Sequence, residues 1–395
     1  MKKNNFHFLN IYANRFLGDM VPILPILPLL LLERGFTLST ISLFLLCFSV
    51  TVLVAEIPVG VLADIRSPRL VVITSRLFKL LAFGVLLFAV NTYVLCFTAI
   101  LWGLASALDS GAMQSYLFQL SRQYGREKEF ESVYGKTFTA ALLGLLLAGL
   151  IASQISMLGF VTLQYIGIGA LMLCFVSVLF FPTLNTVTTR EAKIAENVGD
   201  KNNFRSLFRF ESTLLILLAI GIFAGGIKGS LDEYTTLLLV DKELAVGVIG
   251  YIVFGLEVLK TSGAAVAARF KLTTRNQLMV LGVLGLAFIA AAVGNYGVAI
   301  AALMLVILID AVLWVQNDTA IQRRASDNNR ATVASVKNFG TELLAAGVFL
   351  ITWLFGDYYN TSLLYIIGGL LLLLMSIFLL LKYKREALIL DKANS

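Results

Sequence analysis

The sequence has 395 residues, of which 58% are hydrophobic and only 14% charged, with a formal net charge of +7. Soluble globular proteins are closer to half apolar and carry about a quarter charged residues, so this composition excludes an ordinary soluble protein. Long, nearly uncharged runs, among them 80–108, 160–181 and 278–309, reach the length of about 20 residues that a helix needs to cross a bilayer. Because backbone polar groups find no partner in lipid, these runs predict helices, and the fold class is an all-α integral membrane protein.

Breaks at polar, glycine and proline positions divide the chain into twelve predicted transmembrane helices. In chain order they span residues 7–32, 38–62, 71–90, 93–119, 132–154, 160–181, 211–239, 246–268, 276–294, 297–321, 331–355 and 361–381. The first contains Pro22, Pro25 and Pro28, which remove backbone donors and are expected to distort its outer half. The three cysteines lie in separate helices, so their spacing predicts neither a metal site nor a disulfide framework.

The loops between these helices alternate in charge. Nearly all basic residues outside the helices fall on one side, and the other side holds only Arg34 and Lys242. The positive-inside rule therefore places both termini in the cytoplasm, and we expect a multi-pass protein of a bacterial inner membrane. Topology alone accounts for the positive net charge, so no nucleic-acid partner is needed. Residues 182–210 form the longest polar segment and are predicted to be a cytoplasmic linker, whose basic residues are expected to be solvated or to face anionic lipid.

Charged residues recur 201 positions apart along the chain. The pairs are Glu56 and Glu257, Asp109 and Asp310, Arg122 and Arg323, and Lys136 and Lys337. Such coincidences carry weight in a chain with so few charges. They predict two six-helix bundles, residues 1–181 and 211–395, in which the second repeats the first in the same orientation. Parallel repeats of this kind occur in transporters, which bind substrate near the bilayer midplane.

The loop after the second predicted helix resembles the signature of the major facilitator superfamily, G-x-L-A-D-r-x-G-r-[RK]. The matching residues are Gly60, Leu62, Ala63, Asp64 and Arg69, whereas Ile65, Ser67 and Pro68 depart from it. Glu56 lies two helical turns before Asp64 on the same face. The resemblance implies a twelve-helix transporter fold in which Glu56, Gly60, Asp64 and Arg69 form a gating motif. In this interpretation Asp64 latches one conformation by meeting a cation or a helix N-terminus, and the alternative is a solvated loop acid.

The resemblance also implies that the first, fourth, seventh and tenth helices line the central cavity. These helices carry Asp19, Asp109, Asp232 and Asp310, and ionisable groups inside a membrane are functional candidates because they are costly to place there. Arg15 and Lys228 each precede an acid by four residues, so Asp19 and Asp232 are alternatively members of local ion pairs. Asp109 and Asp310 have no local base on their own helix, and we expect them to bind substrate or protons; the alternative is a buried acid that is hydrogen-bonded to neighbouring helices.

Other intramembrane residues are weaker candidates. Trp102 and Trp314 lie on the fourth and tenth helices and are placed to stack on an aromatic or cationic substrate, with packing as the alternative. Arg76 and Lys79 lie in the first turns of the third helix, and we expect them to extend to the cytoplasmic interface.

These features predict a secondary active transporter, and the leading hypothesis is proton-coupled efflux of lipophilic or cationic small molecules, as in multidrug antiporters. Two marks of the drug antiporters are absent, because Ala99 stands where their fourth helix has arginine and residues 140–149 contain no proline. The alternative is a transporter of one metabolite, siderophore or lipid, working as an importer or uniporter. A non-transporting membrane receptor on the same fold has little use for costly buried acids.

The sequence contains no arrangement of residues typical of an enzyme. Gly135-Lys136-Thr137 resembles the end of a phosphate-binding loop, but Phe130 replaces the required glycine, so energy is expected from an ion or substrate gradient. The expected partners are a small-molecule substrate, protons and membrane lipids, with no cofactor or metal, and the chain is expected to be a monomer.

Overall fold

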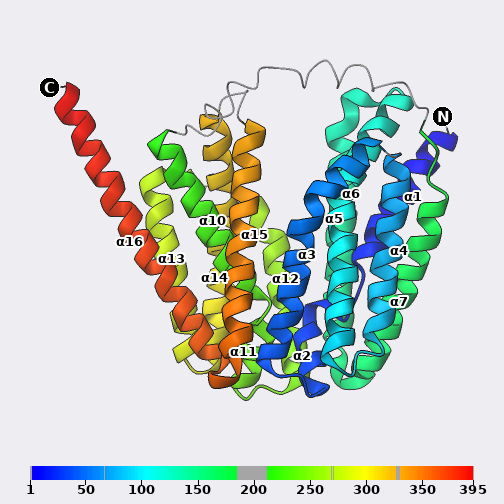
Figure 1. Cartoon of the computed structure of the whole chain (residues 1–395), viewed down its shortest axis with the longest axis horizontal. Helices are drawn as coiled ribbons and strands as arrows, with labels where there is room; N and C mark the ends of the chain where they lie inside the picture. Colours follow the sequence, from blue (N-terminus) through cyan, green and yellow to red (C-terminus); the bar gives the residue numbers. More distant parts are fainter. Residues whose placement is uncertain are drawn as a thin grey trace. The chain divides into compact units, whose positions relative to one another are not determined.

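A computed structural model of the chain describes residues 2–65, 67–184, 211–267, 269, 271–325 and 330–394. The elements within these ranges are helical, as Figure 1 shows. The first part of the chain forms α1 (Lys2–Asp19), η1 (Leu24–Ile26), α2 (Leu27–Glu33), α3 (Leu38–Ile65), α4 (Pro68–Leu86), α5 (Thr92–Gln123), η2 (Glu127–Glu129), α6 (Phe130–Ala152) and α7 (Ile155–Leu179). The second part forms α10 (Ser212–Asp232), α11 (Thr235–Asp241), α12 (Val246–Ala267), α13 (Thr274–Val293), α14 (Tyr296–Arg324), α15 (Arg330–Phe355), η4 (Gly356–Tyr358) and α16 (Thr361–Asn394). Most of the predicted linker, 182–210, lies outside the described residues.

The predicted helices are present, with two differences in continuity. The first predicted helix is interrupted after Asp19, and a single 3-10 turn leads into α2, as expected from Pro22, Pro25 and Pro28. The seventh was predicted to run unbroken over 211–239, which is wrong, because α10 ends at Asp232 and α11 begins at Thr235. No proline marks that break in the sequence.

Eleven stretches of the described residues are long and apolar enough to cross a membrane. The remaining predicted span, α4, is not among them, because it has three charged residues, Arg69, Arg76 and Lys79, within its 19 residues.

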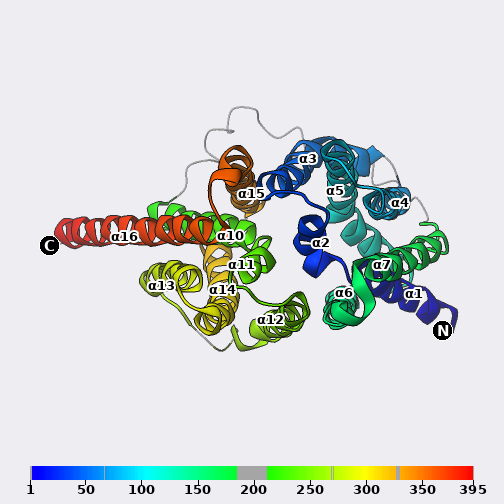
Figure 2. The same cartoon turned by 90° about the horizontal axis from the view of Figure 1, so that it is seen from below.

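The contacts divide the chain into two compact units, residues 1–189 with 245–257, and residues 190–244 with 258–395. This division differs from the predicted domain boundaries in that residues 245–257, which include the first half of α12, are grouped with the first unit. In the first unit α1 packs against α6 and α7, and α4 packs against α5 and α7. In the second unit α10 packs against α15 and α16, and α13 packs against α14 and α16, so each pair has a counterpart. The end-on view in Figure 2 shows these neighbours within each unit.

The two basic residues on the predicted outer side have matching contacts in the two units. Arg34 follows α2 and donates hydrogen bonds to Leu86 O, at 2.5 Å, and to Gln164 Oε1, at 3.0 Å. Lys242 follows α11 and donates a hydrogen bond to Ala292 O. Leu86 and Ala292 lie at the C-terminal ends of α4 and α13, where a positive charge and a donor satisfy free carbonyl groups. Arg34 and Lys242, the two exceptions to the loop charge pattern, therefore stabilise equivalent turns in the two units.

Close helix contacts in both units depend on glycine. A Cβ atom at Gly144 on α6 would lie 2.2 Å from Phe16 O on α1. In the second unit, Cβ atoms at Gly285 and Gly369 would lie 2.5 and 2.6 Å from each other's carbonyl oxygens, on α13 and α16. Small residues allow such backbone contact between membrane helices, which associate through packing rather than through a hydrophobic driving force.

We expect Gly144→Ala to destabilise the first unit, because its methyl group would have to displace the α1 backbone. Overpacking of this kind costs about 1–3 kcal/mol. Gly135→Ala, on the same helix, is the matched control, since its Cβ meets no atom within 4 Å. Thermal unfolding of the two purified variants in detergent measures the difference, and equal melting temperatures would contradict the tight α1–α6 contact.

Candidate functional site

Five ionisable side chains of the first unit meet inside the helix bundle, and we call them the first charge cluster: Arg15 and Asp19 on α1, Arg76 and Lys79 on α4, and Asp109 on α5. Asp109 contacts two guanidinium groups, through Oδ2 with Arg15 Nη1 at 2.5 Å and through Oδ1 with Arg76 Nη2 at 3.0 Å. Lys79 Nζ lies 3.3 Å from Asp19 Oδ1. The cluster therefore ties three helices together by charge.

Neutral groups fix part of this cluster. Arg76 is only 4% exposed, and its Nε donates to Asn14 Oδ1 at 3.1 Å. Asn14 in turn donates through Nδ2 to Cys174 O at 2.8 Å. Lys79 also donates to Gly18 O, at 2.7 Å. A buried charge is tolerable only when it is paired and hydrogen-bonded, and these contacts meet that requirement for Arg76 and Lys79.

Three side chains of the second unit form the second charge cluster, namely Lys228 and Asp232 on α10 and Asp310 on α14. Lys228 Nζ lies 2.6 Å from Asp232 Oδ2 and 3.2 Å from Asp310 Oδ2. The lysine side chain is 10% exposed, whereas Asp232 is 34% and Asp310 23% exposed. Lys260, which is exposed on α12, attracts Asp310 more weakly than Lys228 does. In the contacts described, the two carboxylates thus share Lys228.

The two clusters are related by the internal repeat. Arg15 and Lys228 are 213 residues apart, as are Asp19 and Asp232, and α1 and α10 both end at the acid. The acids of α5 and α14, Asp109 and Asp310, keep the 201-residue offset. A change of offset between the first helix and the later ones conceals this relation in the sequence. In each unit a base of the first helix meets the acid of the fourth.

The surroundings of these repeated residues differ. At the 201-residue offset, Gln277 and Val280 stand where the first unit has Arg76 and Lys79. Among the ion-pair contacts described above, the first cluster has three bases and two acids, and the second has one base and two acids. These contacts therefore give a positive excess in the first cluster and a negative excess in the second.

The structure brings the predicted acids together in pairs within each unit and corrects several predicted contacts. The local pair of Lys228 with Asp232 is confirmed. The proposed local pair of Arg15 with Asp19 is wrong, because Arg15 contacts Asp109 and Asp19 contacts Lys79. The expectation that Arg76 and Lys79 extend to the interface is also wrong, since both point into the bundle and are mostly buried. The free-energy cost of placing two positive charges inside a membrane could have indicated that Arg76 and Lys79 have partners within the bundle.

The two predicted tryptophans have different surroundings. Trp102 packs among aromatic rings of its own unit, with centroid distances of 4.6 Å to Phe48, 5.7 Å to Phe83 and 6.2 Å to Phe44. These contacts correspond to the packing alternative. Trp314 on α14 is 58% exposed.

The gating motif is partly described. Glu56 is exposed on α3, whereas the surroundings of Gly60 and of the Asp64 side chain lie outside what the structure describes. Arg69 donates to Phe181 O through Nε, at 2.7 Å, and to Leu179 O through Nη2, at 2.8 Å. A cation at a helix C-terminus is favourable, so Arg69 holds the start of α4 against the end of α7.

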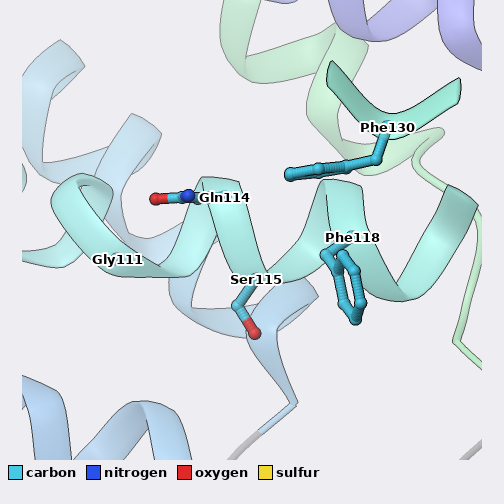
Figure 3. Close-up of a pocket in the computed structure, with 5 residues that line it drawn as sticks. All are labelled: Gly111, Gln114, Ser115, Phe118 and Phe130. Carbon is cyan, nitrogen blue, oxygen red and sulfur yellow. The ribbon is translucent and has the colours of Figure 1, made fainter. Parts of the chain in front are cut away.

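One face of α5 is polar and exposed, a feature that the sequence analysis did not identify. Gly111, Gln114 and Ser115 lie on this face at helical spacing, and with Phe118 and Phe130 they line a pocket of about 340 Å³ (Figure 3). The rings of Phe118 and Phe130 meet edge to face, 5.3 Å apart. The pocket is shallow and open, unlike the enclosed clefts that typically bind small molecules.

Metal binding has no obvious site in the described residues. No group of three or more His, Cys, Asp or Glu side chains is placed there to hold an ion.

Comparisons with known proteins agree with this architecture. The family model of the Major Facilitator Superfamily matches residues 8–346. The Bacillus subtilis (strain 168) protein named "Uncharacterized MFS-type transporter YxaM" is 24% identical over 241 residues, which cover 58% of this chain and 57% of the relative. The chain thus spans little more than half of that curated relative.

Solved structures of transporters share the fold at low sequence identity. The nucleoside transporter NupG is 13% identical with a TM-score of 0.74, covering 96% of this chain and 99% of its own. The D-xylose-proton symporter is 12% identical with a TM-score of 0.68, covering 95% and 96% respectively. With the family match over most of its length, the all-helical fold and the repeated charge clusters, the chain belongs to the major facilitator superfamily of membrane transporters.

Proposed function

We propose that this chain is a proton-coupled secondary transporter of a small polar metabolite, and that the second charge cluster binds the proton. The observation that carries the proposal is that Asp232 and Asp310 share Lys228 inside the membrane-spanning part of the second unit.

The charge of this cluster favours reversible protonation. One carboxylate is compensated by Lys228, and the second adds a net negative charge. Burial in a medium of low dielectric constant disfavours the charged form of a carboxyl group, and two neighbouring carboxylates disfavour each other's ionisation. Binding of one proton makes the cluster neutral, and because the two acids share a cation, the proton belongs to the pair rather than to either residue.

Asp109 is a poorer proton site than Asp310, although the repeat relates the two. Its two oxygens contact Arg15 and Arg76 separately, so its negative charge is already compensated. Protonation of Asp109 would leave the buried Arg76 with a neutral partner, which is costly in a membrane.

The same contacts weaken the efflux hypothesis. A preference for cationic drugs was predicted from an excess of acids over bases on the cavity helices. Arg76 and Lys79, contributed by α4, reverse that excess in the first unit. The alternative, a transporter of one metabolite that works as an importer, therefore has better support. Structural neighbours named as nucleoside, peptide and D-xylose-proton transporters favour the same class.

We further propose that the protein lies in a bacterial inner membrane with both termini in the cytoplasm. The support is the uneven distribution of basic loop residues. A cysteine at position 195, in a variant without the native cysteines, should react with a membrane-impermeant thiol reagent only after cells are opened. Labelling in intact spheroplasts would show that this position is outside, which contradicts the proposed orientation.

Asp310→Asn should uncouple transport from the proton gradient without preventing folding, because Lys228 keeps Asp232 as its partner. In proteoliposomes with an imposed pH gradient, labelled nucleosides, pentoses and organic acids are screened for accumulation by the wild type. The variant should still exchange the accumulated substrate in counterflow but should lose nearly all gradient-driven accumulation.

The matched control is Asp357→Asn, which removes an exposed carboxylate from η4 and should accumulate substrate normally. Unchanged accumulation by Asp310→Asn would remove the second cluster from the proton pathway. The second cluster would also be excluded from the proton pathway if Asp109→Asn lost the pH response and Asp310→Asn kept it.

The polar face of α5 should be in contact with water, since lipid would leave Gln114 and Ser115 unsolvated. Gln114→Cys, in a background without native cysteines, should react with a charged methanethiosulfonate reagent, and substrate should slow the reaction. Phe97→Cys is the control, because Phe97 is an exposed apolar residue of the same helix. If the cysteine at position 114 reacts no faster than the cysteine at position 97, the Gln114 face lies in lipid or in contact with protein, and the prediction is contradicted.

A further inference from the structure

The first charge cluster contains one more base than acids, although it lies within membrane-spanning helices. Arg15, Arg76 and Lys79 face Asp19 and Asp109, and every contact between them is an ion pair within the first unit. An uncompensated positive charge is unfavourable in a membrane. A transporter can retain such a charge when its substrate supplies the missing negative group.

Arg15 is the member of the cluster that is free to exchange partners. Asp109 is held by two guanidinium groups on different oxygens, so the departure of Arg15 leaves Arg76 in place as counter-ion. Arg76 is 4% exposed and is also fixed by Asn14, whereas Arg15 is 24% exposed. The Nε–H of Arg15 is buried and donates to no partner among the described residues, so this donor still lacks the acceptor that a ligand would supply.

The positive excess is a property of this unit and not of the repeated fold. The second unit forms the equivalent contact between Lys228 and Asp310 with Gln277 and Val280 at the positions of Arg76 and Lys79. The fold can therefore be built without the two additional bases. Their presence on α4 compensates Asp109 and Asp19 and leaves Arg15 as the surplus cation.

We propose that the substrate is an organic anion and that Arg15 binds its carboxylate. The planar guanidinium group forms two parallel hydrogen bonds with a carboxylate, which a point charge cannot do. This inference rests on the proposed transport function and names the class of substrate. Arg15 exchanges Asp109 for the substrate carboxylate, and the first cluster becomes electrically neutral.

The test measures binding at one pH and without any gradient, so that it is independent of proton coupling. Full-length protein in lipid nanodiscs is heated with organic anions, each paired with its amide: benzoate with benzamide, succinate with succinamide, and pyruvate with pyruvamide. At least one carboxylate should raise the melting temperature of the wild type in a saturable way, and its amide should not.

Arg15→Gln should raise the half-saturating concentration of that carboxylate at least tenfold. Its ligand-free melting temperature should not fall, because the substitution removes the surplus charge and leaves Arg76 on Asp109. Arg15→Lys keeps the charge without the fork, and it should bind with intermediate affinity. Lys382→Gln, which removes an exposed positive charge from α16, is the matched control and should bind as the wild type does.

Asp310→Asn separates this inference from the proposed function, because it should lose proton coupling and keep anion binding. Three results would overturn the proposal: no carboxylate in the panel stabilises the wild type, an amide stabilises it as well as its acid, or Arg15→Gln binds with unchanged affinity. If Arg15→Gln does not fold, Arg15→Lys provides the test. Unchanged affinity in Arg15→Lys would mean that Arg15 is only a structural charge, and this result would overturn the proposal.

Discussion

A carboxylate in the middle of a membrane helix has to be compensated, and this requirement organises both units of the protein. Asp109 on α5 and Asp310 on α14 each meet a base of the first helix of their unit, Arg15 at 2.5 Å and Lys228 at 3.2 Å. An ion of either sign left alone there would be strongly destabilising, so Asp109 has to face the bases of α1 and α4, and Asp310 the base of α10. Glycine contacts such as that of Gly144 with α1 then bring the neighbouring helices to backbone distance.

The internal repeat contains two versions of this ion pair, and the surroundings of the two versions differ in charge. In one copy α4 adds Arg76 and Lys79, which makes the carboxylates fully compensated and leaves a base in excess. In the other copy Gln277 and Val280 add no charge, and Asp232 competes with Asp310 for Lys228. A compensated acid is a structural element, whereas an acid in excess responds to a proton. The difference between the copies is therefore more informative about mechanism than their likeness.

Much of the fold could be predicted from hydrophobic runs, loop charge and the repeat, because these depend on the bilayer and not on detailed packing. The acids of both clusters were also predictable, since their cost marks them. Their partners were less so. The pair of Lys228 with Asp232 follows from helical spacing, but the contact of Arg15 with Asp109 depends on which faces of α1 and α5 meet. The change of repeat offset from 213 to 201 concealed the match of Arg15 with Lys228, and the break after Asp232 has no proline to announce it.

Opposite excess charge in the two clusters also gives a physical reason for coupling. With neither ligand bound, the first cluster has a positive excess and the second a negative excess among the ion-pair contacts described. With an organic anion on Arg15 and a proton on the acids of the second cluster, each cluster is neutral by itself. A carrier with only one of the two ligands has a net charge that moves with it through the low-dielectric bilayer, which raises the energy of its conformational change. Under the proposed function, empty and fully loaded carriers are then the species expected to change conformation, which is the condition for symport.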